Sequence, residues 1–415
     1  ENQYDEALLR FGKELIVSGD HRYFDASRRW SYPGHGGKKD SLIKRLDANE
    51  TPYLPLIRAH VGPYDSQATR QESIDRFLDW VDILAKNGSL DILSIGTSQL
   101  SQSHFNQDWT DLPNGGGVPI QYPHEFEAIY QASRPMLVRT YAGTSNLVDL
   151  AKMYEQTINI SWHALSLWWF NKLDGRGPYD LYTNLKAHFE TMAYIATTKK
   201  PMEANVSHHF AFRGADDITY IVSNYLCAKL AKQMGIRHFV CQNMLNTPRF
   251  TWGIQDLAKA RAMLLLIKPL EDKHFKVIHQ PRAGLDYFKP DIDKAKIQLA
   301  AVSALMDDID PHNRHSPPII HVVSYSEALF LATPEVIHES IQITQHAIAS
   351  YRRLRQKDAI RDMSHHPEID KRVKEMLDQA KKLIHAIENL IPDPYSPEGF
   401  YLIFASGFLP VPYLW

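Results

Sequence analysis

The fold is decided by a stretch that begins LPLIRAH (residues 54–60), continues through SIDRFLDWVDILA (residues 73–85) and ends LDILSI (residues 90–95). The first and last segments are short apolar runs, which are typical of buried strands. The middle segment has apolar residues three and four positions apart, and this spacing predicts an amphipathic helix. The stretch therefore predicts one strand, helix and strand unit of a layered α/β fold.

The same alternation recurs along the chain and gives eight units in all. Runs that are apolar on both faces suit parallel strands that lie between other layers, and eight such units are what a closed (β/α)8 TIM barrel requires. An open doubly wound sheet would alternate in the same way, but no G-x-G-x-x-G opens a helix after the first run. We therefore predict an α/β fold, a (β/α)8 TIM barrel. The expected strands are Leu54–His60, Leu90–Ile95, Met136–Tyr141, Ile158–Trp162, Met202–Val206, His238–Gln242, Phe275–His279 and Ile319–Val323.

The pattern divides the chain into three regions. Residues 1–50 form an N-terminal helical extension, residues 51–360 form the barrel, and residues 361–415 form a C-terminal helix with a tail rich in Pro and aromatic residues. The tail ends apolar and needs a surface on which to dock. The clearest helices are Tyr4–Val17, Ser73–Ala85, Phe126–Ser133, Asp216–Met234, Ile254–Ile267, Asp291–Met306, Pro334–Leu354 and Ile369–Leu390.

Composition excludes several classes of protein. The 415 residues include 46 Lys and Arg against 48 Asp and Glu, a net charge of −2, which disfavours binding to nucleic acid or to a membrane surface. No apolar run approaches the roughly 20 residues that span a bilayer. Only two cysteines are present, so a disulfide scaffold and a multi-cysteine metal site are excluded. We expect a cytoplasmic protein.

Polar residues that close the apolar runs are the first candidates for a site, because barrel active sites lie at the carboxyl ends of the strands. Arg58 and Arg139 stand within otherwise apolar runs, where an unpaired charge costs several kcal/mol. They are interpreted as holders of an anion or carboxylate. The alternative is a buried ion pair with a neighbouring acidic residue.

Other motifs give weaker signals. His208-His209 invites a metal interpretation, but adjacent residues of a strand point to opposite faces and could not both bind one ion, so we expect no metal site. The glycines after Asn114 allow the backbone to approach a ligand, or form a flexible turn. No H-E-x-x-H, P-loop or G-x-S-x-G motif occurs, so hydrolytic chemistry has no signature.

In its ordered set of strand-end motifs, the chain resembles the large (epsilon) subunit of glutamate mutase, the adenosylcobalamin-dependent methylaspartate mutase. The resemblance is distant and collinear, and it covers residues from Leu54 to the C-terminus. The motifs that carry it are Ile57-Arg58-Ala59, Asn114-Gly115, Val138-Arg139 with Gly143-Thr144, Met202-Glu203, Asn243-Met244 followed by Ile254-Gln255-Asp256-Leu257-Ala258, His279-Gln280 with Gly284, and Ser326-Glu327-Ala328.

The resemblance implies a barrel whose mouth is capped by adenosylcobalamin, which is carried on a small Rossmann-like cobalamin-binding subunit or domain. The D-x-H-x-x-G signature of that partner is absent, because the sequence from Asp310 through His312 lacks the glycine. This chain would then be the catalytic subunit of an oligomer. The implied reaction is a carbon-skeleton 1,2-rearrangement by a 5′-deoxyadenosyl radical, which requires a lumen that excludes water.

Site residues follow from the positions that match the family and from the positions that depart from it. Cofactor binding is assigned to Asn114, Glu203, His279, Gln280 and Glu327, with Asn114 and Glu327 at the adenosyl ribose. Substrate binding is assigned to Arg58, Arg139, Arg282, Trp162 and Gln102. No residue is assigned to the catalytic step itself.

Departures from the family pattern point away from glutamate as the substrate. The second arginine that holds substrate in the family falls near Gln102, its amine-binding glutamate falls at Trp162, and its lysine near the ribose falls at Val323. Arg282 stands where the family has an apolar residue, and we expect it to supply a new anion contact. We therefore expect a carboxylate other than glutamate, with a larger apolar part that faces Trp162 and Trp168.

Three alternatives stay open. The first is an aminomutase that uses pyridoxal phosphate with cobalamin, which would need a Schiff-base lysine at the mouth or from the partner. The second is a non-catalytic corrinoid-binding barrel that has lost its substrate site. The third is an ordinary barrel enzyme that uses no cobalamin and acts on a small anionic metabolite.

Overall fold

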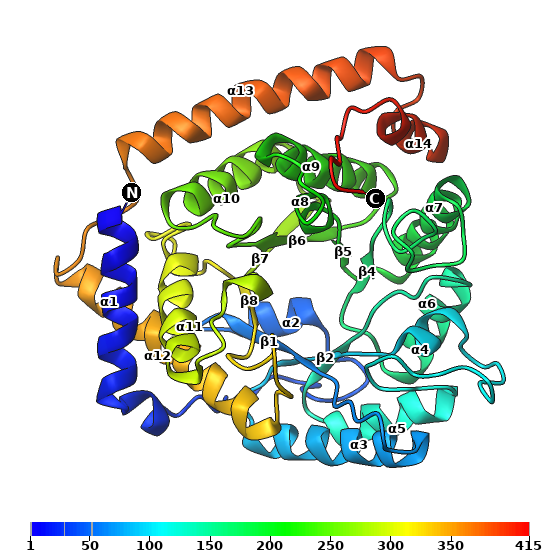
Figure 1. Cartoon of the computed structure of the whole chain (residues 1–415), viewed down its shortest axis with the longest axis horizontal. Coiled ribbons are helices and arrows are strands. Elements are labelled where there is room, and N and C mark those ends of the chain that lie inside the picture. Colours follow the sequence, from blue (N-terminus) through cyan, green and yellow to red (C-terminus); the bar gives the residue numbers. More distant parts are fainter. Residues whose placement is uncertain (1, 29, 51–52, 415) are drawn as a thin grey trace.

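The computed structural model describes residues 2–28, 30–50 and 53–414, and it is built on a ring of eight parallel strands (Figure 1). β1 pairs with β2 and β8, and the sheet runs from β3 at one end to β4 at the other. Between those ends, the backbone N–H of Ser161 donates to the carbonyl oxygen of Val138 (2.8 Å). The sheet is nearly closed, so the predicted α/β TIM barrel is confirmed. The strands are β1 (Leu56–Val61), β2 (Ile92–Ile95), β3 (Leu137–Arg139), β4 (His163–Leu165), β5 (Met202–Ala204), β6 (His238–Met244), β7 (Lys276–Arg282) and β8 (Ile319–Val322).

Helices surround the strands, and several begin at residues that the sequence supplies as caps. The side chains of Thr69, Asp216 and Thr333 each accept a hydrogen bond from a backbone N–H three residues later. The six predicted barrel helices are present with small shifts at their ends, while α4, α6, α7 and α8 lie outside the predicted set. The helices are α3 (Arg70–Asn87), α4 (Gln99–Ser103), α5 (Pro123–Ser133), α6 (Leu147–Thr157), α7 (Leu181–Thr198), α8 (Ser207–Ala211), α9 (Asp217–Gln233), α10 (Ile254–Ile267), α11 (Ile292–Asp307) and α12 (Pro334–Gln356).

The prediction of the fourth strand at Ile158–Trp162 is wrong, because the strand lies just beyond, at His163–Leu165. Ile158 follows directly on the last residue of helix α6, and Asn159 adopts the left-handed conformation with φ 45°, which an extended strand does not allow. The apolar residues of this run are buried as the chain enters the barrel. Burial, rather than strand pairing, explains their composition.

The amino-terminal end of the lumen is closed by a small apolar cluster. Helix α2 (Leu42–Asp47) contributes Leu42, which packs with inward side chains at the starts of the strands. Beside it, the buried Arg45 guanidinium pairs with Asp40 (2.5 Å). Part of the N-terminal extension therefore forms the floor of the barrel. The inward members of the cluster are Leu56, Ile92, Leu137, Trp162, Val240, Ile278 and Ile319.

Three further helices pack on the outside of the barrel. Helix α1 (Asn2–Ser18) lies along α11, α13 (Pro367–Leu390) crosses α9 and α10, and α14 (Pro397–Ala405) packs on α7 (Figure 1). Phe400 of α14 stacks on Trp168, with ring centroids 4.6 Å apart. The C-terminal region thus docks on the barrel wall. In the part of the chain that the structure describes, no helix is long and apolar enough to cross a membrane.

Candidate anion-binding site in the barrel lumen

Above the apolar floor, a buried polar layer is organised around the carboxylate of Glu203 on β5. Its oxygens accept hydrogen bonds from Nη2 of Arg139 (3.2 Å each) and Nη1 of Arg58 (3.4 Å). The indole N–H of Trp162 donates to the same carboxylate (2.6 Å). The hydroxyl of Ser94 bridges the two guanidiniums. Glu203 is therefore the counter-ion that holds both arginines in the lumen.

The charges in this layer do not balance. Burial acts to raise the pKa of Glu203, but the guanidiniums of Arg139 and Arg58 outweigh it and hold the pKa below its usual value. Burial and the nearby Arg139 lower the pKa of Arg58 to about 9, so its side chain stays charged at neutral pH. Two cations on one carboxylate leave an excess positive charge. Both arginines therefore form a buried ion pair with an acidic residue, which was the alternative expected from the sequence. One positive charge of the pair of arginines is left without a counter-ion among the described residues.

Arg282, at the carboxyl end of β7, adds a third guanidinium near the mouth. Its Nε donates to the carbonyl oxygen of Ala283 (3.1 Å), and within the described residues it forms no ion pair. Its exposed fraction is 8%, against 1% for Arg58 and 0% for Arg139. Burial raises the pKa of Glu327, the acidic residue that faces Arg282. Arg282 is therefore the arginine that an incoming anion meets first.

Neutral rings line the lumen between these arginines. The ring of His60 lies 4.9 Å from that of His321 and 5.6 Å from that of Tyr141, measured between centroids. Burial and the nearby guanidiniums lower the pKa of His60 and His321 well below the usual value, so both imidazoles are uncharged. Both ring nitrogens of His321 are buried without a hydrogen-bond partner in the described chain. These atoms are free to bind a polar group of a ligand.

Several residues assigned to the substrate from sequence lie elsewhere. Trp162 belongs to the floor, is fully buried, and lies beneath Glu203, while Trp168 lies outside the ring of strands under α14. Neither faces the mouth, which corrects the expectation that they contact an apolar part of the substrate. Gln102 on α4 donates to the carbonyl oxygen of Thr97 (3.1 Å) and lines a cavity toward α6. It lies outside the lumen, because it follows the strand rather than belonging to it.

The residues assigned to the cofactor are dispersed. Gln280 faces the lumen and accepts a hydrogen bond from Arg58 (3.0 Å), while its neighbour His279 faces the outer helices and lines a cavity with Leu264. Glu327 follows β8 and accepts a hydrogen bond from the N–H of Ser324 (3.3 Å). The side chain of Asn114 is bonded within its own loop, to the backbone of Gly116 and Gly117. Of the five, Glu203, Gln280 and Glu327 lie in or at the lumen.

The expectation that His208 and His209 lie on a strand and point to opposite faces is wrong. The two residues lie on the short helix α8 rather than on a strand, and their ring centroids are only 4.1 Å apart. The expectation of a strand failed because Ser207 turns the chain into a helical turn directly after β5. Within the described residues, no group of three or more His, Cys, Asp or Glu side chains is placed to hold a metal ion.

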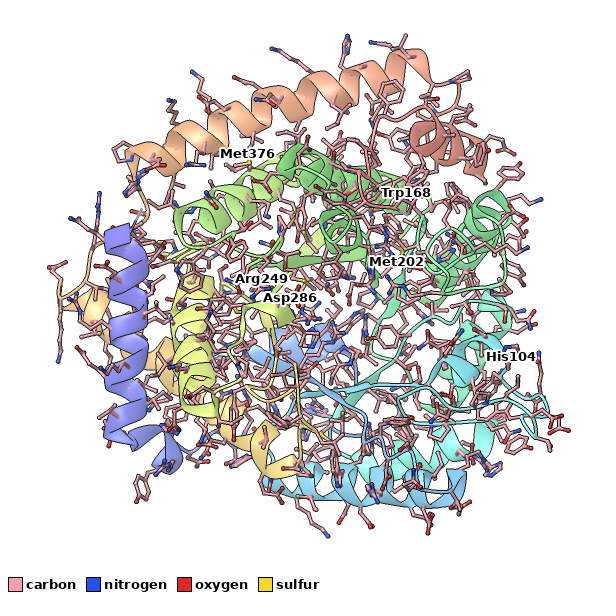
Figure 2. All side chains as sticks on the ribbon, viewed as in Figure 1. His104, Trp168, Met202, Arg249, Asp286 and Met376 are labelled. Atoms are coloured by element: carbon pink, nitrogen blue, oxygen red, sulfur yellow. The ribbon has the colours of Figure 1, made fainter. Side chains whose placement is uncertain are left out.

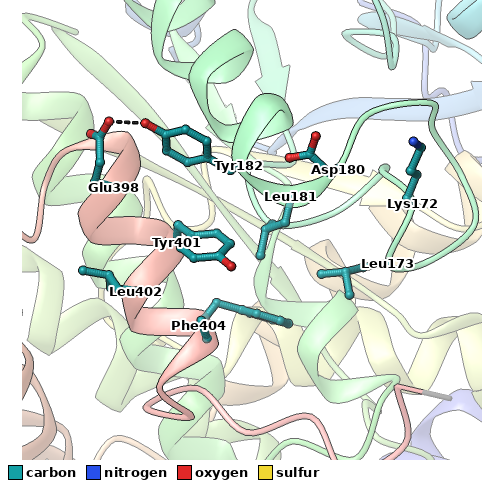
Figure 3. Close-up of a pocket in the computed structure, with 10 residues that line it drawn as sticks. Lys172, Leu173, Asp180, Leu181, Tyr182, Glu398, Tyr401, Leu402 and Phe404 are labelled. Carbon is teal, nitrogen blue, oxygen red and sulfur yellow. Dashed lines mark hydrogen bonds between the residues drawn. The ribbon is translucent and has the colours of Figure 1, made fainter.

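A large apolar groove lies away from the strand ends, between α7 and α14 (Figure 3). Its volume is about 910 Å³, and Leu181, Tyr401 and Phe404 line it. At one end the hydroxyl of Tyr182 is hydrogen-bonded to the carboxylate of Glu398, drawn as a dashed line in Figure 3. The groove is outside the barrel, so it is not part of the lumen site.

Comparisons with known proteins add little to this picture. No protein-family model matches the chain, and no curated protein sequence matches it. Among solved structures, the spore coat polysaccharide biosynthesis protein SpsE of Bacillus subtilis is similar, with a TM-score of 0.42 and 10% identity, over 76% of this chain and 73% of that chain. A likeness of this size does not indicate a function for the chain.

Proposed function

We propose that this chain is the barrel subunit of an adenosylcobalamin-dependent radical mutase that rearranges the carbon skeleton of a carboxylate other than glutamate. The observation that carries the substrate part of the proposal is the excess of positive charge in the lumen. Arg58 and Arg139 share the carboxylate of Glu203, and Arg282 adds a third guanidinium that forms no ion pair within the described residues. An anion that enters this low-dielectric space offsets that excess. The reaction class rests on the family resemblance of the strand-end motifs.

In this proposal, the chain's own residues bind and orient the substrate. Arg282 pairs with the substrate carboxylate at the mouth, and a bidentate contact fixes its direction. Arg58 and Arg139 attract the anion from below but keep their bonds to Glu203, since both are buried beneath the mouth. The neutral ring of His321 offers a hydrogen bond that does not compete for the carboxylate. The closed floor blocks water at the amino-terminal end of the lumen.

The polar atoms at the mouth fit the nucleoside part of adenosylcobalamin. The carboxylate of Glu327 and the hydroxyl of Ser324 lie after β8, above His321. Among the described residues, neither that hydroxyl nor the ring nitrogens of His321 have a hydrogen-bond partner. A ribose that presents hydroxyl groups would satisfy such atoms. When bound, the cofactor supplies the radical that removes hydrogen from the substrate. Asn114 and Glu203 would not bind it in this arrangement, because their polar atoms are already used.

The rim of the mouth suits a protein partner that carries the cofactor. The loops after β5, β6, β7 and β8 expose large apolar side chains, and all four loops lie at the carboxyl end of the barrel. Arg249 and Asp286, labelled in Figure 2, mark two of these loops, which reach toward the middle of the view. Exposed apolar side chains gathered at one end of a molecule are typical of an interface. The exposed residues are Phe212, Phe250, Leu285, Leu329, Phe330 and Leu331.

The proposal is tested by mixing the chain with adenosylcobalamin and a small cobalamin-binding subunit, in the dark and without oxygen. A ternary complex seen by mass, together with an acid-dependent radical signal in electron paramagnetic resonance, is the expected result. The variant Arg282→Gln should form the complex but lose the radical signal. Absence of any complex, with the corrin spectrum unchanged, would refute the proposal that the chain uses adenosylcobalamin.

One observation favours a second candidate, a corrinoid-binding barrel without a substrate site. Arg58 and Arg139 already use Glu203 as their counter-ion and are almost fully buried. This candidate predicts that the complex forms but that no small acid binds to the lumen. Aminomutase chemistry is less favoured, because the inward positions of the eight strands hold no lysine except the exposed Lys276 at the start of β7.

A further inference from the structure

A second cluster of cationic and polar side chains lies at the edge of the mouth, beyond β4 and β5. Asp174 and Arg176 lie in the loop after β4, and His209 and Arg213 follow β5. Nη2 of Arg176 donates to Nδ1 of His209 (3.3 Å), and Nη1 of Arg213 donates to the carbonyl oxygen of His209 (2.8 Å). The guanidinium of Arg176 also lies over the ring of Phe170, 4.4 Å from its centroid. The cluster is therefore held by several independent contacts.

The single carboxylate in the cluster is fully used. Asp174 accepts hydrogen bonds from the backbone N–H groups of Phe170 and Asn171 (3.0 Å each) and lies near Nε of Arg176 (3.3 Å) and Nη2 of Arg213 (3.5 Å). It is fully buried, so it anchors the loop rather than facing a ligand. Two guanidiniums against one carboxylate leave a net charge of one positive unit. The side chain of Arg176 is 38% exposed, so solutes can reach that charge.

The histidines of the cluster present donors. Arginine can only donate, so Nδ1 of His209 accepts and its ring proton is on Nε2. The amide nitrogen of Gln242 donates to Nδ1 of His208 (3.2 Å), which places the proton of that ring on Nε2 as well. Nε2 of His209 is buried with no partner in the described chain, and 5% of the residue is exposed. Nη1 of Arg176 likewise makes no hydrogen bond to the described residues.

We infer that this cluster, made of Arg176, Arg213, His208 and His209, is a binding site for a phosphoryl group. Its free polar atoms are all donors and its net charge is positive, which matches a group that offers only acceptors and carries negative charge. A phosphate monoester carries about 1.5 to 2 negative charges at neutral pH and three terminal oxygens. A carboxylate has two oxygens and one charge, so the free donors of Arg176, His208 and His209, with the added charge of Arg213, suit a phosphoryl group better. The inference holds whether or not the chain is a mutase, because none of these side chains belongs to the lumen ion pair.

The phosphoryl group has two possible sources, a phosphorylated substrate or a phosphorylated cofactor. Residues between the lumen and the cluster are in contact. Arg58 donates to Gln280, Gln280 lies beside Gln242 of the adjacent strand, and Gln242 donates to His208 of the cluster. The cluster therefore lies next to the lumen. O-phosphoserine represents the first source, and pyridoxal phosphate the second.

The test is isothermal titration calorimetry of the full chain with inorganic phosphate, O-phosphoserine and pyridoxal phosphate, each beside serine or pyridoxal without the phosphoryl group. Phosphate should bind, and Arg176→Gln and His209→Gln should weaken it by about tenfold or more, because each removes a charge-assisted or buried contact. Arg176→Lys should bind with intermediate strength. Arg249→Gln is the matched control, since Arg249 is exposed on the same face and forms no ion pair within the described residues.

Tighter binding of either phosphorylated ligand than of its dephosphorylated form supports the site and identifies its source. Equal binding of phosphate by the wild type, Arg176→Gln and His209→Gln would overturn the inference, as would absence of binding at millimolar concentration. Melting curves of each variant establish that it is folded. A second titration with malonate, a small dicarboxylate, tests the lumen site separately. Malonate binding that is lost in Arg282→Gln but kept in Arg176→Gln would show that the lumen site is intact even if the phosphoryl site fails.

Discussion

Glu203→Gln is the substitution that tests the charge arrangement of the lumen most directly. The change keeps the shape of the side chain but removes the carboxylate that accepts hydrogen bonds from Arg58, Arg139 and Trp162. Breaking a buried pair by removing one partner costs about 3–5 kcal/mol, since the remaining charge is left uncompensated in a medium of low dielectric. Here two guanidiniums are left, so we expect a cost at the upper part of that range.

The loss should be visible in thermal unfolding. An unfolding entropy of about 2.1 cal/mol/K per residue gives about 0.9 kcal/mol/K for 415 residues, so a cost of about 4–5 kcal/mol lowers Tm by about 5–6 °C if the chain unfolds as one unit. Asp82→Asn is the control, because Asp82 pairs with Lys86 on an exposed helix surface and its loss should not change Tm measurably. Both variants are compared with the wild type by differential scanning calorimetry.

The pH dependence gives a second, independent readout. The pKa of Glu203 is lower in the folded chain than in the unfolded chain. Its contribution to the free energy of unfolding is therefore fully present above the unfolded pKa of about 4.3, and it is lost as the pH falls through the folded pKa. The stability difference between wild type and Glu203→Gln should therefore be constant near neutral pH and shrink under acid. A Glu203→Gln variant as stable as the wild type at pH 7, or a difference that persists in acid, would refute the assignment of Glu203 as counter-ion.

Three further predictions follow from other parts of the structure. Arg282→Gln should weaken binding of small carboxylates about tenfold or more, measured by calorimetry. Its Tm should stay almost unchanged, because Arg282 forms no ion pair within the described residues. A lower Tm without weaker binding would contradict this role. Burial raises the pKa of Asp256 to about 7, so the contribution of Asp256 to the free energy of unfolding should fall as pH rises from about 4 to about 7. Asp256→Asn should remove that pH dependence, measured by urea unfolding at several pH values. Phe400→Ala should cost about 3–5 kcal/mol in urea unfolding, because its buried ring stacks on Trp168, whereas Tyr413→Ala, at a side chain 75% exposed, should cost little; equal losses would contradict docking of the tail.

The barrel could be predicted from sequence because its signals are local. Strands buried on both faces are apolar over several residues, and caps such as Thr69 and Asp216 mark where helices begin, so each unit is visible in a short window. The fourth strand is the exception, since Ile158–Trp162 is apolar for another reason, namely burial at the entrance to the barrel floor. Composition alone does not distinguish the two causes.

The candidate site was predictable in part. Arginines inside apolar runs indicated a buried charge site, and the structure brings Arg58, Arg139 and Arg282 into or next to the same lumen. Which of two neighbours faces inward was not predictable, as Gln280 and His279 show. A strand alternates its faces with period two, so an assignment from motif order alone cannot separate adjacent residues.

Local sequence patterns were enough to predict the eight-fold alternation of strands and helices, the extent of the barrel in the chain, and the charged residues at strand ends. Two features became visible in the folded chain alone: Glu203 of the fifth strand is the partner of arginines on the first and third, and His208 and His209 share a helical turn with Arg213 close by. The physical reason is that helix and strand patterns follow from side chains a few residues apart, whereas an ion pair depends on distances set by closure of the whole sheet.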